Sequence, residues 1–147
     1  MEPDELITQI RAAFATVGRP SWDNIVCHDC RECYDLRDGL LGFPSAELPD
    51  TWFDWNWDQL PLLSDEAKRY YLPAYLCFAL RQPKSLAAEF VLYALGSDHR
   101  WQPPGGYSEA QRQVVREYLD FERRRLPEGD VSLDGIEQAA QRWRASA

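Results

Sequence analysis

The sequence predicts an all-α fold, a compact bundle of about six helices that forms a single domain over residues 1–147. Three observations predict it. The chain is long enough to bury one core, and its hydrophobic content of 45% is that of a folded protein. Apolar residues recur at helical spacing in segments that Gly and Pro separate, and no segment predicts a strand with comparable strength.

The N-terminal half predicts two helices and then an irregular segment. Apolar residues at helical spacing predict the first helix over residues 4–17, and a Gly and a Pro follow it. A cap at Ser21 or Asp23 starts a second helix, which is expected to run to about Leu36. Prolines exclude a long helix in the aromatic-rich segment 43–63, which we therefore expect to be irregular.

The C-terminal half predicts four more helices. They are expected at about residues 64–81, 85–96, 109–126 and 133–144. Pro73 lies inside the first of these, so a kink or a break into two pieces is expected there. The Gln-Pro-Pro-Gly-Gly run predicts a turn at 102–106, and the Ser-x-x-Gln capping box of Ser108 and Gln111 follows it.

The charge of the chain excludes two classes of partner. The formal net charge is −8 and the isoelectric point is about 4.7, whereas nucleic acids and anionic membranes require a basic surface. No apolar run is long enough to cross a bilayer. The opening stretch lacks the basic start and apolar core of a signal peptide, so we expect a cytoplasmic location.

The charge is also unevenly distributed. Residues 1–66 carry 14 acids and 4 bases, whereas residues 67–147 carry 10 acids and 12 bases. This asymmetry predicts an acidic face and a separate, weakly basic one. The acidic face has two interpretations, a solvated surface that keeps the protein in solution or a surface that attracts a basic protein partner.

A cluster of metal-binding residue types lies in the expected second helix. Its candidate ligands are Cys27, His28, Cys30 and Cys33. Thiolates and imidazoles are the preferred ligands of zinc, and Cys77 or His99 could complete a tetrahedral site. Against zinc, the chain has no second pair of closely spaced ligands. The alternatives are a redox-active pair, or reduced thiols buried along one side of the helix.

The aromatic segment 50–58 has an alternating pattern. Phe53, Trp55 and Trp57 alternate with acids and Asn, as in an extended segment with one buried face. Asp54, Asn56 and Asp58 also have the spacing of a calcium-binding loop, but Gln59 stands where that loop requires Gly.

The same segment is also a candidate recognition surface, because flat rings beside carboxylates suit sugars, peptides and cations. Its candidate binding residues are Trp52, Trp55, Trp57, Asp54 and Asp58.

Three tyrosines flank Pro73 and are further candidate binding residues. Tyr70, Tyr71 and Tyr75 carry hydroxyls that need hydrogen-bond partners when buried, so we expect a polar network against the acidic half of the chain. A kinked core helix explains the pattern, and a ligand pocket or hinge beside the proline is the alternative.

The string EAKRYYLPAYLCFAL at residues 66–80 resembles a family of uncharacterised bacterial proteins, a domain of unknown function with a similar YYLPAYL helix. The matching pieces that precede it here are Ala13-Phe14, Arg19-Pro20 and the helix around Cys30-Arg31-Glu32-Cys33. The resemblance spans about residues 7–120. It implies a compact helical domain and supplies no activity, cofactor or catalytic residue.

These patterns support one main expectation and two alternatives. The main one is a non-enzymatic interaction protein with an acidic face for a basic protein partner and no cofactor, comparable to immunity proteins that neutralise basic toxins. The first alternative is a metal- or thiol-dependent protein that uses the cluster at Cys27, Cys30 and Cys33. The second is a small hydrolase with a site between the aromatic segment and Pro73, where His28 or His99 would lie beside a carboxylate.

Overall fold

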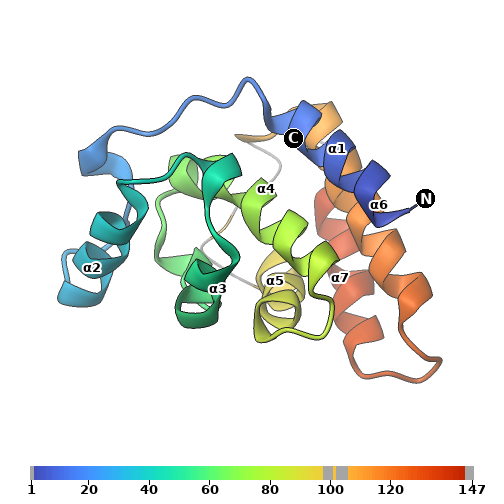
Figure 1. Ribbon diagram of the computed structural model, residues 1–147. Coiled ribbons are helices and arrows are strands. Elements are labelled where there is room, and N and C mark those ends of the chain that lie inside the picture. Colours follow the sequence, from blue (N-terminus) through green and yellow to red (C-terminus); the bar gives the residue numbers. More distant parts are fainter. Residues whose placement is uncertain (1, 98–100, 102–105, 145–147) are drawn as a thin grey trace.

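A computed structural model describes residues 2–97, 101 and 106–144 (Figure 1). The described residues form seven α-helices and no strand, apart from one isolated bridge between Val26 and Leu63, so the all-α prediction is confirmed. None of the described helices combines the length and the hydropathy needed to cross a bilayer.

Seven α-helices and three short 3₁₀ turns follow one another along the chain. The α-helices are α1 (Pro3–Phe14), α2 (Arg31–Leu40), α3 (Asp50–Asn56), α4 (Asp65–Arg81), α5 (Leu86–Ser97), α6 (Glu109–Arg125) and α7 (Ser132–Arg144). The 3₁₀ turns are η1 (Trp22–Asn24), η2 (Ser45–Glu47) and η3 (Leu60–Leu62). Figure 1 shows α1, α6 and α7 at one end of the molecule, α4 and α5 in the middle, and α2 with α3 at the other end.

Helix α4 lies at the centre of the core. The Ser64 hydroxyl caps its start by accepting a hydrogen bond of 3.1 Å from the backbone N–H of Ala67. The helix continues through Pro73, so of the expected kink or break into two pieces the break is wrong, and the kink stays a prediction. A proline inside a helix costs about 3 kcal/mol, and the burial of its neighbours Leu72 and Leu76 offsets that cost.

The second helix begins later than the sequence predicts. Residues 22–24 form only the turn η1, and α2 starts at Arg31. The backbone N–H of Cys27 donates to the carbonyl of Leu62 at 3.0 Å, and that of Ser64 donates to Ile25 at 2.8 Å. These long-range bonds hold the chain extended before α2, so the expected helix over 21–36 is wrong in its first half.

The aromatic segment is helical rather than extended. Residues 50–56 form α3, in which Phe53 is buried and Trp55 is 84% exposed. Phe53 and Trp57 are four residues apart, on the same side of a helix, and both pack against the core. The prediction that Phe53, Trp55 and Trp57 share a buried face is therefore wrong for Trp55.

The C-terminal helices agree with the sequence prediction to within one or two residues at each end. Helices α5 and α7 approach closely at Gly96, where an added Cβ would lie 3.1 Å from the carbonyl oxygen of Gly135. The Trp143 indole donates to the Leu95 carbonyl at 3.1 Å and packs edge-on against Trp101. Of the turn expected at 102–106, only Gly106 belongs to the described residues, and residues 102–105 lie outside them.

Helix α6 begins with the predicted capping box. The Ser108 hydroxyl accepts from the Gln111 backbone N–H at 3.1 Å, and the Gln111 side chain accepts from the Ser108 N–H at 2.9 Å. We expect Ser108→Ala to lower the free energy of unfolding by about 1 kcal/mol, measured by chemical denaturation. Ser108→Asp, which keeps an acceptor at the cap, is the matched control. An unchanged unfolding curve for Ser108→Ala would contradict the role of the box.

Candidate functional site

Residues 21–63, from η1 to η3, form the acidic end of the molecule (Figure 1). This acidic end carries nine acids and two bases. Eight of the nine acidic residues are exposed, and Asp58 is half-buried. Asp29 and Asp54 form no ion pair within the described part of the chain. The acidic end therefore presents a field of uncompensated negative charge to solvent.

Large apolar side chains are exposed on the same end. Five of the eight exposed large hydrophobic residues in the described ranges lie there: Trp22, Tyr34, Leu41, Phe43 and Trp55. Aromatic residues are enriched where proteins contact partners, since each ring buries a large area at a low cost in conformational entropy. The acidic end thus combines the two features that a charge-guided binding surface needs.

Arg37 arranges two of these rings. Its guanidinium carbon lies 3.6 Å from the ring centre of Trp22 and 4.6 Å from that of Tyr34. Contacts of this kind between a cation and an aromatic face contribute about 0.5–1 kcal/mol at exposed sites. The stack brings a ring from η1 and a ring from α2 to one place on the surface.

The acidic end is tied to the core at several points. The Arg19 side chain donates to the carbonyls of Leu40 and Leu41 at 3.0 and 2.7 Å, which satisfies the free carbonyls at the end of α2. The buried Tyr75 hydroxyl donates to the Asn56 carbonyl, where α3 ends, at 2.8 Å. These bonds hold the exposed rings and carboxylates on a fixed support.

The cysteine cluster is split between loop and helix. Cys27 and Cys30 are exposed and precede the helix, whereas Cys33 is buried inside α2, so the expectation of three buried thiols along one helix is wrong. The Cys30 sulfur accepts from the Cys33 backbone N–H at 3.4 Å and thereby caps α2. Burial, together with the neighbouring Cys30, raises the pKa of the Cys33 thiol from 9.0 to about 11.

The possible fourth metal ligands lie elsewhere. Cys77 is buried in α4, and burial raises the pKa of its thiol. His28 is exposed beside Cys27, and His99 lies outside the described residues. Among the described residues, no three His, Cys, Asp or Glu side chains come together in a way that could hold a metal ion. Because one possible ligand, His99, lies outside the described residues, the zinc alternative stays a prediction.

The predicted aromatic and tyrosine sites separate into surface and core. Trp55 and Asp54 face solvent, Asp58 is half-buried, and Trp52 and Trp57 pack partly against the core. Tyr71 and Tyr75 are buried, and burial raises the pKa of both hydroxyls. Tyr70 is half-buried, and its hydroxyl accepts from the Ser45 backbone N–H at 3.3 Å. Hydrogen bonds thus link Tyr70 and Tyr75 to the acidic end. The buried Tyr71 hydroxyl lies near Arg19 but forms no hydrogen bond of standard geometry within the described residues, so the expected network forms for two of the three tyrosines.

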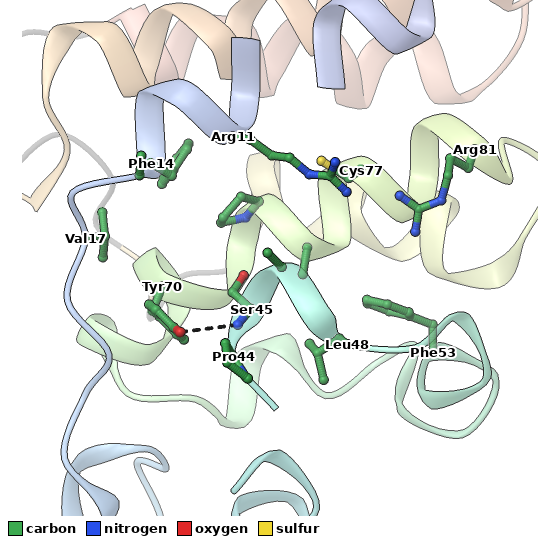
Figure 2. Close-up of a pocket in the computed structure, with 14 residues that line it drawn as sticks. Arg11, Phe14, Val17, Pro44, Ser45, Leu48, Phe53, Tyr70, Cys77 and Arg81 are labelled. Atoms are coloured by element: carbon green, nitrogen blue, oxygen red, sulfur yellow. Dashed lines mark hydrogen bonds between the residues drawn. The ribbon is translucent and has the colours of Figure 1, made fainter. Parts of the chain in front are cut away.

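A pocket of about 310 Å³ lies where α1, η2 and α4 meet, between the aromatic segment and Pro73 (Figure 2). The lining residues are Arg11, Phe14, Ala15, Val17, Pro44, Ser45, Ala46, Leu48, Phe53, Tyr70, Pro73, Ala74, Cys77 and Arg81. They include neither His nor a carboxylate, so the described lining supplies no pair for general acid–base catalysis. The hydrolase alternative expects such a pair here, and the lining does not provide it.

Comparison with known proteins finds no match: no protein-family model, no curated protein and no solved structure is significantly similar to the chain. The family resemblance of residues 66–80 therefore stays a prediction.

Two sets of residues at these sites carry no signal in the sequence. Arg11 and Arg81 line the pocket, but in the sequence each is an ordinary basic residue near the end of a helix. Trp22 and Tyr34 lie on the exposed surface. In the sequence Trp22 only stands next to an expected helix cap, and nothing there indicates its contact with Arg37. Only the three-dimensional arrangement reveals either set.

Proposed function

We propose that the protein is a non-enzymatic interaction protein whose acidic end binds a basic protein partner. The observation that supports this function is the coincidence of unpaired carboxylates and exposed aromatic rings on residues 21–63. An immunity protein that neutralises a basic toxin is a physical model for such a surface.

The charge of the acidic end would act mainly on the encounter. Exposed carboxylates such as Asp29 and Asp54 attract a basic surface over about one Debye length, roughly 8 Å at physiological ionic strength. They increase the association rate more than the final affinity. Like charges at the same positions would repel acidic proteins, which provides selectivity.

The exposed rings would supply most of the binding energy. Trp and Tyr are the residue types whose truncation most often weakens a protein complex by 2 kcal/mol or more. Trp55 is 84% exposed on α3, so nearly its whole side chain is free to be buried by a partner. Trp22, held against Arg37, offers a second ring at a fixed orientation.

We also propose a cytoplasmic location. Cys27 and Cys30 are exposed free thiols. Such thiols persist in a reducing compartment and are oxidised elsewhere.

Selection of short random peptides displayed on a surface tests this proposal. We expect wild-type protein to enrich peptides rich in Lys and Arg that also contain apolar residues.

Trp55→Ala should weaken binding of a selected peptide by about 2 kcal/mol without changing the fold, since the side chain has few contacts within the protein. Asp29→Asn combined with Asp54→Asn should slow association about tenfold at low salt. The measurement is surface plasmon resonance over a range of salt concentrations.

The matched control removes the same charge from the opposite end. Asp134→Asn combined with Glu128→Gln changes two exposed acids near α7 and should leave association unchanged. The proposal is wrong if the enriched peptides carry no positive charge. It is also wrong if Trp55→Ala and the Asp29/Asp54 variant bind them as wild-type protein does.

A further inference from the structure

We propose that the pocket between α1, η2 and α4 binds a small anionic amphiphile, an apolar molecule that carries one carboxylate. The proposal is independent of the proposed protein partner, because none of the exposed rings of the acidic end lines this pocket. Its volume of about 310 Å³ is at the lower end of the range for sites that bury small ligands.

The walls of the pocket are apolar, and Phe53 of α3 adds to those from α1, η2 and α4. Phe14 and Val17 lie at and beyond the end of α1, Leu48 follows η2, and Pro73 and Ala74 belong to α4 (Figure 2). Walls of this kind stabilise the apolar body of a ligand by removing its surface from water.

The charge of the lining favours an anion. The whole chain carries 24 acids and 16 bases, yet the pocket is lined by two arginines and no acid. Figure 2 shows Arg11 reaching from α1 and Arg81 from α4 to the same side of the pocket, with the Cys77 sulfur next to the Arg11 guanidinium. A cationic ligand would be repelled at this place, and a carboxylate would be attracted.

The two arginines differ in how their charge is compensated. Arg81 forms an ion pair of 2.7 Å with Asp50, so most of its charge is already neutralised. Arg11 forms no ion pair within the described residues, and its neighbour Cys77 holds a thiol whose pKa is raised by burial. The free charge at the pocket is therefore that of Arg11, and a guanidinium can hold one carboxylate through two parallel hydrogen bonds.

Tyr70 offers a further polar contact. Its hydroxyl oxygen accepts the backbone N–H of Ser45 at 3.3 Å, and no described residue accepts its own proton. The hydroxyl can therefore donate to a ligand oxygen. The lining thus combines apolar walls, one cation without an ion pair and one hydroxyl that can donate a hydrogen bond. This arrangement suits a ligand with an apolar chain and a carboxylate.

Three probes with one apolar chain and different head groups test the proposal: decanoate, decanol and decylammonium. Isothermal titration calorimetry at neutral pH should show decanoate binding about tenfold more tightly than decanol, and decylammonium binding most weakly. Arg11→Gln should lower the affinity for decanoate about tenfold and leave that for decanol unchanged. Arg31→Gln removes an equal charge from an arginine whose side chain is 94% exposed on α2, and it should bind all three probes as wild-type protein does.

A filled pocket is the second test. Ala74→Leu extends a side chain into the cavity and should abolish binding of both decanoate and decanol, with folding checked by circular dichroism. If that variant does not fold, the comparison of Arg11→Gln with Arg31→Gln decides. The proposal is overturned if decanol or decylammonium binds as tightly as decanoate, or if Arg11→Gln binds decanoate as wild-type protein does.

Discussion

Phe53→Ala is expected to lower the free energy of unfolding by about 3–5 kcal/mol, a large part of the stability of a domain of this size. The Phe53 ring is 2% exposed and stacks on Phe78 with 4.5 Å between ring centres. It also meets Tyr75 edge-on at 5.1 Å. Truncation would remove these ring contacts and leave a cavity between α3 and α4.

Trp55→Ala is the matched control for this prediction. Trp55 belongs to the same helix and has a larger side chain, but it is 84% exposed, so its loss should change stability by no more than about 0.5 kcal/mol. Chemical denaturation followed by far-ultraviolet circular dichroism measures both variants without relying on tryptophan emission. An equal loss of unfolding free energy in the two variants, or no loss in Phe53→Ala, would contradict the burial of Phe53 and the exposure of Trp55 on α3.

Trp143→Ala should lower the free energy of unfolding by a similar amount, about 3–5 kcal/mol. The Trp143 side chain is completely buried and lies edge-on to Trp101 and Tyr107, with ring centres 5.5 and 5.0 Å away. Its indole N–H also donates to the Leu95 carbonyl of α5 at 3.1 Å. The variant therefore loses both the packing and the hydrogen bond that join α7 to α5.

Val131→Ala provides the comparison for Trp143. Val131 comes just before α7 and is 89% exposed, so the same denaturation measurement should show a change within about 0.5 kcal/mol. If Trp143→Ala unfolds at the same denaturant concentration as Val131→Ala, α7 does not pack against α5 as described.

The C-terminal helices could be predicted because their signals are local. The capping box needs only Ser108 and Gln111, which are three residues apart, and the structure confirms it. The start of α4 depends in the same way on Ser64 and the N–H three residues later. Signals of this kind do not depend on the rest of the fold.

The errors in the N-terminal half come from contacts between distant parts of the chain. The start of α2 is delayed because Cys27 pairs with Leu62, 35 positions along the chain. In α3, seven residues fit an alternating period and a helical period almost equally well. Pro49 before the helix and Asp50 in its first turn favour the helix, and burial of Phe53 against α4 stabilises it.

The candidate sites were less predictable than the fold. The acidic character of residues 1–66 and the aromatic segment both point to the acidic end, but the exposure of Trp55 beside the burial of Phe53 follows from the helix. The pocket is built from α1, η2, α3 and α4, and it brings together Arg11 and Arg81, which are 70 residues apart in the sequence. No pattern in the sequence indicates that these two arginines lie close together in the fold.

The proposed function requires a basic partner to bind at the acidic end. The most direct measurement is a two-dimensional NMR titration of the backbone and indole N–H groups with a peptide selected as described above. We expect the indole signals of Trp22 and Trp55 and the amides of α2 and α3 to shift, while the buried indoles of Trp101 and Trp143 keep their positions. Shifts confined to α6 and α7, with the Trp22 and Trp55 signals unchanged, would contradict the claim.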